Sequence, residues 1–385
     1  MTQKTYAIVG GGIGGLTLAI ALQQKGYAVT VYENAPVIKP LGAGIVLAGN
    51  AMKAFATIGL DQQVLKAGKE MKEFVIFDQQ GETLSRADAE KINAKFDVVN
   101  TLTLHRADLH AVLLNQLAPG TVLLDKNCID FKQEHDRVTL FFGDGSAASA
   151  DAVIAADGIH SIFRKRLLPS VNLRYSGYTC WRAVVDQQPE GFNDSVASET
   201  WGAGLRFGTV PLSNNRVYWF ATADAPMKDA GIAAFTPDLL GDLFKDFHAP
   251  IENIIRQTKQ AQLIHNDIMD FVPVKQFAFG PIVLMGDAAH ATTPNLGQGA
   301  CMAIEDAVIL ANCISKSNDV KNAFVNFERQ RINRTTKIVN TSFSLGKVGQ
   351  FKNPLLVKIR NAGMRLTPAR VAEKQLKFLY DISFA

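Results

Sequence analysis

The sequence has few cysteines and no metal-binding pattern. Its 385 residues include four cysteines, and no two of them stand at C-x-x-C spacing: Cys128, Cys180, Cys301 and Cys313. Scattered cysteines argue against a disulfide framework and a structural zinc site, so we expect reduced, partly buried thiols. His105 and His110 are five residues apart, which puts them on different faces of a helix. We therefore predict no protein-bound metal.

The sequence also lacks a convincing membrane-spanning run. Residues 5–24 carry no charge, but glycines cluster where a spanning helix is continuous, and no A-x-A-like cleavage site follows cleanly. We find no other run of about 20 apolar residues. There is no internal repeat or low-complexity linker, and the length favours two domains over one. These observations predict a cytoplasmic protein without stable membrane insertion.

Acidic residues are scarce near the C-terminus. The formal net charge is +4, yet residues 351–385 hold seven basic residues against two acidic ones, so this segment alone carries +5 and the remainder −1. Apolar residues interleave with the basic ones at helical spacing, which favours amphipathic terminal helices with a solvated basic face. Contact with nucleic acid or an anionic membrane is the alternative, and nothing else supports nucleic-acid binding.

A glycine-rich turn near the N-terminus is the clearest motif. The apolar run Tyr6–Val9 leads into Gly10, Gly12 and Gly15 at G-x-G-x-x-G spacing, and a helix-forming stretch follows. In such a strand, turn and helix, the first glycine permits the turn and the second lets the backbone approach a pyrophosphate. The third lets the helix pack closely, and the helix N-terminus holds the phosphates. We predict a dinucleotide site here.

A carboxylate stands where such a site needs one. The second apolar run, Ala28–Tyr32, ends at Glu33, 23 positions after Gly10. An acid at this place accepts hydrogen bonds from ribose hydroxyls, which favours FAD or NAD over NADP. A glycine-rich turn without a ligand is the alternative, and the agreement of strand, spacing and acid disfavours it.

The order of segments predicts a nucleotide domain that is interrupted twice. Phe74–Phe77 and Glu82–Ser85 flank a turn and are typical of a hairpin, whereas Val153–Ala155 and Ile282–Met285 are typical of buried parallel strands. We expect the following boundaries: nucleotide domain 1–72, 101–177 and 276–330; substrate domain 73–100 and 178–275; C-terminal helices 331–385.

Two later motifs join the glycine-rich turn. One is Ala156–Arg164, which contains Asp157 and Gly158, and the other is Gly286-Asp287 followed by Pro294-Asn295-Leu296-Gly297-Gln298-Gly299. In this order the three motifs resemble the FAD-dependent aromatic hydroxylases, the single-component flavoprotein monooxygenases. The resemblance covers Tyr6 to about Arg331. It implies an α/β fold of the p-hydroxybenzoate hydroxylase-like type, in which an antiparallel substrate domain is inserted into a Rossmann-like FAD-binding domain.

The resemblance also implies a set of cofactor-binding residues. Asp287 is expected beside the ribityl chain or the pyrophosphate, and the helix after Gly299 is expected to begin under the isoalloxazine ring. The loop 41–45 matches a segment that lies against the flavin. Helix capping is the alternative role for Asp287 and Arg106. The full expected set is Gly10, Gly12, Gly15, Glu33, Gly44, Arg106, Asp157, Gly158, Asp287, Pro294, Gly297, Gly299 and Ala300.

Within the family, the segment Tyr175–Trp181 is most similar to zeaxanthin epoxidases and FAD-dependent urate hydroxylases. That likeness implies that Arg206 and Tyr218 are catalytic residues facing the substrate, with Arg206 holding an anionic or enolisable ring. Alternation along the two strands predicts both side chains on one face, with Trp219 on the other. A surface ion pair is the alternative for Arg206. Asn295 departs from the acid of urate hydroxylases, which argues against urate itself.

The resemblance implies that NADH or NADPH reduces a non-covalent FAD, and that a flavin C4a-hydroperoxide then passes oxygen from O₂ to an electron-rich aromatic or heteroaromatic small molecule. No protein nucleophile is needed, and none in a Ser-His-Asp arrangement is found. Three alternatives stay open: an FAD oxidoreductase acting on a polyene or antibiotic-like substrate, a non-catalytic flavin-binding protein, and an NAD-dependent dehydrogenase. The oligomeric state is not predicted.

Overall fold

A six-stranded sheet forms one half of the molecule. The computed structural model describes residues 4–37, 43–96, 101–189, 192–368, 371 and 377–384. All neighbouring strands of this sheet run parallel except β18, which is antiparallel to β19. The apolar runs Tyr6–Val9, Ala152–Ala155 and Ile282–Leu284 at the centre of the sheet are buried, as both faces of a parallel sheet require. In spatial order the strands are β18 (Ala278–Phe279), β19 (Ile282–Leu284), β12 (Ala152–Ala155), β1 (Thr5–Val9), β2 (Ala28–Tyr32) and β8 (Val122–Leu123).

Helices cover the parallel sheet. The first, α1 (Ile13–Gln24), has every residue from Ile13 to Leu22 buried, because it packs between the sheet and α11 (Gly299–Ser315). Two small antiparallel sheets flank this layer, β9 (Cys128–Glu134), β10 (Arg137–Phe142) and β11 (Ala147–Ala150) in one, and β3 (Gly44–Leu47), β7 (Leu102–His105) and β4 (Lys69–Glu70) in the other. The remaining helices of this half are α2 (Gly49–Thr57), α3 (Asp61–Ala67), α5 (Arg106–Leu114), α6 (Ile162–Leu167) and α10 (Asp287–His290).

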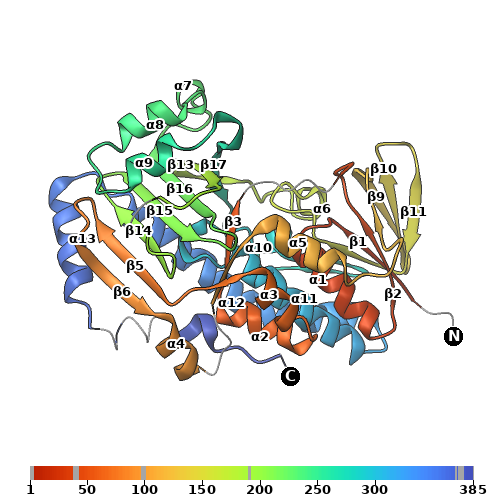
Figure 1. Cartoon of the computed structure of the whole chain (residues 1–385). Helices are drawn as coiled ribbons and strands as arrows, with labels where there is room; N and C mark the ends of the chain where they lie inside the picture. The colour runs from red at the N-terminus through yellow and green to blue at the C-terminus, as the bar shows by residue number, and fades with distance from the viewer. Residues whose placement is uncertain are drawn as a thin grey trace.

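A seven-stranded sheet forms the other half (Figure 1). One face packs Trp181, Phe207 and Trp219 against the helices α7 (Ala230–Ala233), α8 (Pro237–Leu243) and α9 (Ile251–Arg256). The other face is turned toward the parallel sheet. The strands in order are β17 (Ile264–Asp270), β13 (Arg174–Val185), β16 (Val217–Asp224), β15 (Leu205–Pro211), β14 (Val196–Trp201), β5 (Glu73–Asp78) and β6 (Thr83–Asp88), and α4 (Ala89–Phe96) follows β6.

Two helices complete the chain. The long helix α12 (Val320–Gly349) packs against α11 and the loop at η2 (Pro294–Leu296), and α13 (Pro354–Leu366) lies beside β6 at the outer edge of the molecule (Figure 1). No helix within the described ranges is long and apolar enough to cross a membrane.

The structure confirms the p-hydroxybenzoate hydroxylase-like α/β fold and the hairpin, whose strands are β5 and β6. Val153–Ala155 and Ile282–Leu284 pair in parallel, as buried strands of one sheet. The strand around Trp181 begins at Arg174, and a register shift between Tyr175 and Thr179 interrupts its pairing with β17. The boundaries of the domains stay a prediction.

Candidate functional site

The carboxyl ends of four parallel strands meet at one edge of the six-stranded sheet, which we call the carboxyl edge. Gly10 follows β1, Glu33 follows β2, Asp157 closely follows β12 and Asp287 closely follows β19. The chain passes from β1 to β2 on one side and returns as β12 on the other, so the strand order reverses beside β1. Open α/β sheets bind ligands in the crevice at such a reversal.

The three glycines of the turn meet different surroundings. Gly10 has a φ of +109°, and a Cβ on Gly15 would lie 2.1 Å from the carbonyl oxygen of Gly10. The fold therefore leaves no room for a side chain at either position. A Cβ on Gly12 would meet no atom within 4 Å. No side chain caps α1 at Gly12, and its first turn holds no acid. An open surface of backbone N–H groups at a helix N-terminus fits a pyrophosphate.

Glu33 and Arg106 differ in their hydrogen-bond partners. The carboxylate of Glu33 accepts hydrogen bonds from the N–H of Gly11 at 2.6 Å and of Ala35 at 2.9 Å. Arg106 is exposed, and its guanidinium makes no hydrogen bond or ion pair with a residue that the structure describes. The N-cap of α5 is His105, whose Nδ1 accepts the N–H of Ala107 at 3.2 Å. Helix capping is therefore the role of His105 and not of Arg106.

Asp287 lies at the other end of the carboxyl edge. It opens α10 without making a capping hydrogen bond, and its exposed carboxylate has no hydrogen-bond partner among the described residues. Desolvation by the surrounding protein raises the pKa of Asp287, although the charges of His290, Arg106 and Arg164 oppose this. An ionised carboxylate that is partly desolvated and has no hydrogen-bond donor costs free energy. A ligand with several hydroxyl groups could supply the missing donors.

The loop after α10 leads to the N-terminus of α11. Pro294 begins η2 and is exposed, and Gly297 ends it with a φ of +63°. A Cβ on Gly297 would meet nothing within 4 Å, and one on Gly299 would lie 4.0 Å from Oδ1 of Asp287. No side chain caps α11, whose first turn contains Ala300 and no acid. This helix end therefore also presents N–H groups beside Asp287.

Arg164 joins the second motif to the third. Its guanidinium is buried, donates to the carbonyl oxygens of Ile159 and Ala288, and lies 4.4 Å from the ring centre of Phe271. The side chain of Asp157 accepts the N–H of Ile162 at 2.9 Å, while its other oxygen, Oδ1, is buried without a partner in the described part of the chain. Gly158 has a φ of +76° and open space around its Cα. The second motif therefore holds one buried carboxylate oxygen without a hydrogen-bond partner among the described residues.

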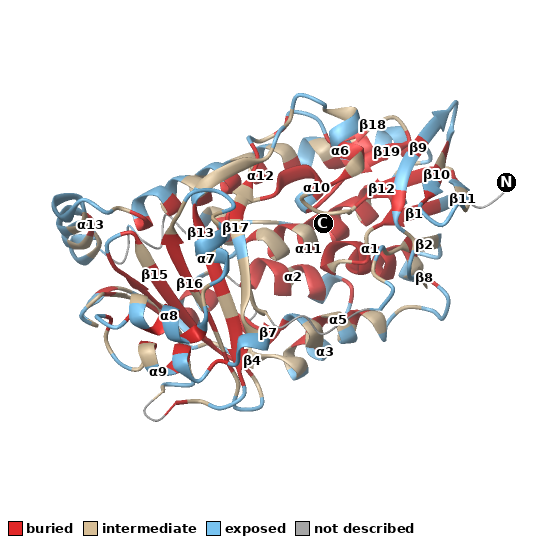
Figure 2. Cartoon of the chain, turned by 90° about the horizontal axis from the view of Figure 1, so that it is seen from above, coloured by how far each residue is buried: buried red, intermediate tan, exposed pale blue. Residues whose placement is uncertain are grey.

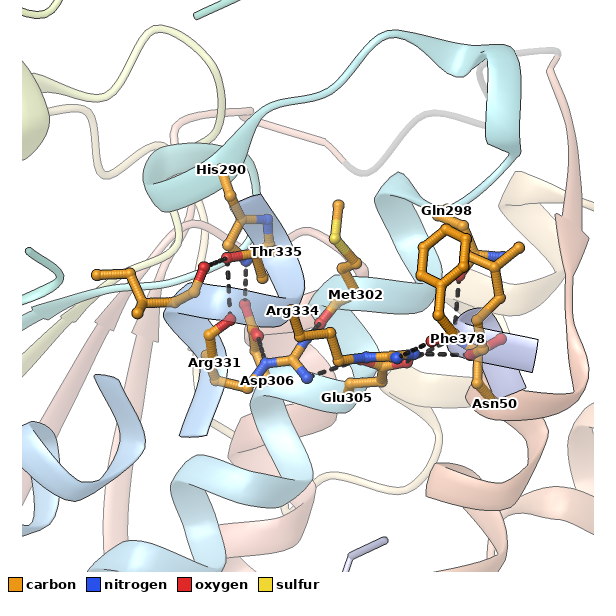
Figure 3. Close-up of polar contacts among 12 residues, drawn as sticks. Asn50, His290, Gln298, Met302, Glu305, Asp306, Arg331, Arg334, Thr335 and Phe378 are labelled. Carbon is orange, nitrogen blue, oxygen red and sulfur yellow. Dashed lines mark hydrogen bonds and ion pairs between the residues drawn. The ribbon is translucent and has the colours of Figure 1, made fainter. Parts of the chain in front are cut away.

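A buried ionic cluster stands behind this loop (Figure 3). Asp306 accepts the N–H of Gly286 at 2.9 Å, lies 2.6 Å from Nε2 of His290, and accepts Nε of Arg331 at 2.6 Å. Burial alone would raise the pKa of Asp306, but the charges of His290 and Arg331 outweigh it and lower the pKa to about 2. An ionised Asp306 thereby fixes the turn that presents Asp287.

The same cluster extends to the C-terminal segment. Glu305 forms ion pairs with Arg331 at 2.7 Å and Arg334 at 2.6 Å, and it accepts a hydrogen bond from Asn50. Arg334 also donates to the carbonyl oxygens of Phe378 and Leu379. Buried ion pairs therefore hold α11 in place.

Arg206 is fully buried, so the alternative of a surface ion pair is wrong. It donates to Glu199 at 3.1 Å, to Gln350 at 2.8 Å and to Asn295 at 2.8 Å. Asn295 also exchanges hydrogen bonds with the phenol of Tyr178. We call these five residues the Arg206 cluster. They join the seven-stranded sheet to the loop at the carboxyl edge and to the end of α12.

Two glycines of α12 make room for this cluster. A Cβ on Gly346 would lie 2.4 Å from Nδ2 of Asn295, and one on Gly349 would lie 3.1 Å from Cδ of Arg206. The acid missing at Asn295 has a counterpart in Glu199, which supplies the negative charge next to Arg206 from a neighbouring strand.

Tyr218 shares the sheet face of Arg206, as the alternation predicted, while Trp219 packs on the opposite face. Arg206 pairs with Thr222 and Tyr218 with Val210, so the two are four residues apart along the strands. Tyr218 packs against Gly44, where a Cβ would lie 2.4 Å from Cγ of the tyrosine. Leu41 and Gly42 of the expected flavin loop lie outside the described residues.

Sequence reasoning missed several residues that build this region. Arg164 lies within the second motif, but the motif does not indicate its role. The sequence around Glu199, Gln350 and Arg331 contains no motif that points to them. The two glycines three apart in α12, Gly346 and Gly349, were the available hint that something packs closely against that helix.

Comparison with known proteins identifies a family and several similar proteins. The family described as FAD binding domain matches residues 3–324. The aurachin C monooxygenase/isomerase of Stigmatella aurantiaca is 39% identical over 95% of this chain and 94% of its own. The 2-heptyl-3-hydroxy-4(1H)-quinolone synthase of Pseudomonas aeruginosa is 35% identical over 94% of each chain. Klebsiella pneumoniae HpxO, solved with FAD and uric acid, superimposes with a TM-score of 0.89 at 27% identity, covering 98% of this chain and 97% of that one.

Proposed function

Since the chain belongs to the FAD binding domain family of aromatic hydroxylases and monooxygenases, we propose that it binds FAD non-covalently at the carboxyl edge and uses NADH or NADPH and O₂ to oxygenate an electron-rich heteroaromatic small molecule. The observation that carries the proposal is that accessible backbone N–H groups and charged side chains without described partners lie together at the carboxyl edge. Gly12, Arg106 and Asp287 all stand there with surface free for a ligand.

In this proposal the N-terminus of α1 holds the pyrophosphate and Glu33 accepts the ribose hydroxyls of the adenosine. Asp287 accepts hydroxyl groups from the other end of the cofactor. The N-terminus of α11, with Gly297, Gly299 and Ala300, faces the isoalloxazine ring, where its dipole stabilises negative charge by about 0.3–2 kcal/mol. FAD supplies the oxygen-activating chemistry, and the chain supplies position and electrostatics.

The substrate would lie between the carboxyl edge and the facing sheet. That sheet face presents an apolar surface around Tyr218, formed by Val184, Val210 and Leu212 with contributions from β3 and β5. The quinolone named for the relative from Pseudomonas aeruginosa carries a heptyl chain. We therefore propose a quinolone-like ring with an apolar tail, in place of the urate that a neighbour at lower identity takes.

Arg206 and Tyr218 have different parts in this proposal. Arg206 holds the loop of Asn295 in register with the substrate sheet, so that the substrate lies at a fixed distance from the flavin. Tyr218, whose phenol makes no hydrogen bond with the described residues, is free to orient the substrate ring. Burial raises the pKa of Tyr218, so it acts as a neutral hydrogen-bond donor at physiological pH.

The test is oxygen uptake by the purified holoprotein with NADH and with NADPH, in the presence of 2-alkyl-4-quinolones, urate, hydroxybenzoates and polyenes, with mass analysis of the product. We expect substrate-stimulated uptake and a product heavier by one oxygen atom with a quinolone. Stimulation by a polyene with an epoxide product would favour the alternative of epoxidation. No stimulation by any compound, and no reduction of the flavin by either nucleotide, would favour a non-catalytic flavin-binding protein.

A further inference from the structure

The helix α13 has its apolar side chains on the outside. Leu355 is 65% exposed, Ile359 59% and Leu366 80%. These residues and the exposed Ala362 are spaced by four, three and four positions, which places them along one stripe of the helix. In Figure 2 the helix stands at one end of the molecule and is coloured mostly as exposed. The expectation that the charged side of this helix is the solvated one is wrong for Arg360, which is 5% exposed.

The orientation of α13 is fixed by polar contacts. Arg360 donates to the carbonyl oxygens of Trp201, Gly202 and Gly349. Burial, and then the charge of Arg206, lower its pKa to about 10. Asn353 caps the helix by accepting the N–H groups of Leu355 and Leu356. The apolar stripe therefore faces outward because an arginine is anchored inward.

The segment of sequence that carries the stripe is basic. Residues 329–372 contain ten Lys or Arg and no Asp or Glu. Some of these are neutralised by partners elsewhere, as Lys352 is by Asp224 and Arg365 by Asp78. Lys347 and Lys358 are exposed, and neither forms an ion pair with a described residue. A second copy of the chain would bring like charges together at this stripe, whereas an anionic lipid surface would neutralise them.

We propose that α13 docks the protein on an anionic membrane surface. The stripe of Leu355, Ile359 and Leu366 would enter the boundary between headgroups and acyl chains, and Lys358 would contact the lipid phosphates. A helix that lies in the interface needs an apolar face and flanking basic residues, but not the length of a membrane span. The inference does not depend on which substrate the proposed enzyme oxidises.

The experiment is co-sedimentation of the full-length, FAD-loaded protein with two kinds of vesicle: phosphatidylcholine alone, and phosphatidylcholine mixed with phosphatidylglycerol. We expect binding to the mixed vesicles that high salt weakens. The double variant Leu355→Ser/Ile359→Ser should bind at least about tenfold more weakly, since full burial of even one such side chain is worth about that factor or more. Lys358→Glu should weaken binding about fivefold or more.

Leu239→Ser is the matched control, because Leu239 is also an exposed leucine on a helix, α8, but has no comparable stripe around it. It should bind like the unmodified protein. The proposal is overturned if the unmodified protein stays in solution, if the double variant binds unchanged, or if both vesicle types bind equally. It is also overturned if light scattering shows a dimer that the double variant dissociates, since the stripe then joins two copies.

Discussion

The carboxyl edge and the Arg206 cluster both contain charged side chains, but they treat them in opposite ways. At the carboxyl edge, Arg106 and Asp287 are exposed and have no hydrogen-bond partner among the described residues. In the Arg206 cluster, one arginine is completely buried, and each of its three guanidinium nitrogens donates to a side chain. The first region is open toward a ligand, and the second is closed within the protein.

This difference distinguishes residues that should bind a ligand from residues that should stabilise the fold. A side chain without a protein partner contributes little to the stability of the protein alone, so its replacement should change ligand affinity. A buried charge with several partners contributes mainly to stability, because its removal leaves other buried groups unpaired. The two regions meet at Asn295, which follows the carboxyl edge in sequence and accepts a hydrogen bond from Arg206.

The largest expected effect is on stability, from Arg206→Ala. Removal of the guanidinium leaves the buried carboxylate of Glu199 without its ion-pair partner, so we expect the free energy of unfolding of the holoprotein to fall by about 3–5 kcal/mol. Arg182→Ala is the control, because Arg182 lies on the same sheet face but is only half-buried and, among the described residues, donates to Asn266 alone. Denaturant titration measures both. Equal midpoints for the two variants would show that the Arg206 cluster is not a closed structural unit.

The next effect is on affinity, from Asp287→Asn. Loss of a charged acceptor should weaken FAD binding by about 1.5–3 kcal/mol, measured by titration of the apoprotein with FAD. Desolvation raises the pKa of Asp287 in the folded protein, so the ionised carboxylate lowers the stability of the apoprotein at neutral pH. The stability that the protonated carboxyl group contributes at low pH is lost as the pH rises through the folded pKa. The apoprotein variant should therefore be no less stable than the unmodified apoprotein. A loss of stability without a loss of FAD affinity would show that Asp287 supports the fold and does not bind the cofactor.

A matched pair of glycine substitutions sharpens the comparison within one turn. Gly12→Ala adds a methyl group where no protein atom lies within 4 Å, so it should impair FAD binding and leave the stability of the apoprotein unchanged. Gly15→Ala places its methyl group 2.1 Å from the carbonyl oxygen of Gly10, so it should cost stability, by about 1–3 kcal/mol. If thermal unfolding of the two apoproteins and FAD titration gave the same pattern for both, Gly12 would not face the cofactor.

The smallest effect is expected for Tyr218→Phe. The phenol has no hydrogen-bond partner in the described structure, so stability and FAD affinity should stay within about 0.5 kcal/mol of the unmodified protein. Only the coupling of NAD(P)H oxidation to product should fall, with more hydrogen peroxide released, once a substrate is known. Because burial raises the pKa of the phenol above its ordinary 10.0, coupling should show no titration of this group below that pH. Unchanged coupling in the variant would remove Tyr218 from the site.

The sequence predicted the carboxyl edge better than the Arg206 cluster, for a physical reason. Gly10, Gly12, Gly15 and Glu33 belong to one strand, turn, helix and strand, and the backbone requirements of such a unit are local. Glu199 reaches Arg206 from the neighbouring strand of the same sheet, but Asn295 and Gln350 reach it from a loop and the end of α12, 89 and 144 residues away in sequence. Only packing of the two halves brings Asn295 and Gln350 to Arg206, and no spacing rule describes it.

The inward anchoring of Arg360 escaped prediction for the same reason. Periodicity shows that a helix has two sides, but it does not show which side the neighbouring sheet will cover. The carbonyl oxygens of Trp201 and Gly202, which lie at the end of β14, decide that orientation.

The most direct test of the open carboxyl edge is to denature the purified protein with acid and identify what it releases. We expect a yellow protein that releases FAD, one molecule per chain, with no flavin left on the polypeptide, and a Gly12→Ala variant that is folded but colourless. Release of FMN, a covalently attached flavin, or a folded unmodified protein that cannot be loaded with FAD would contradict it.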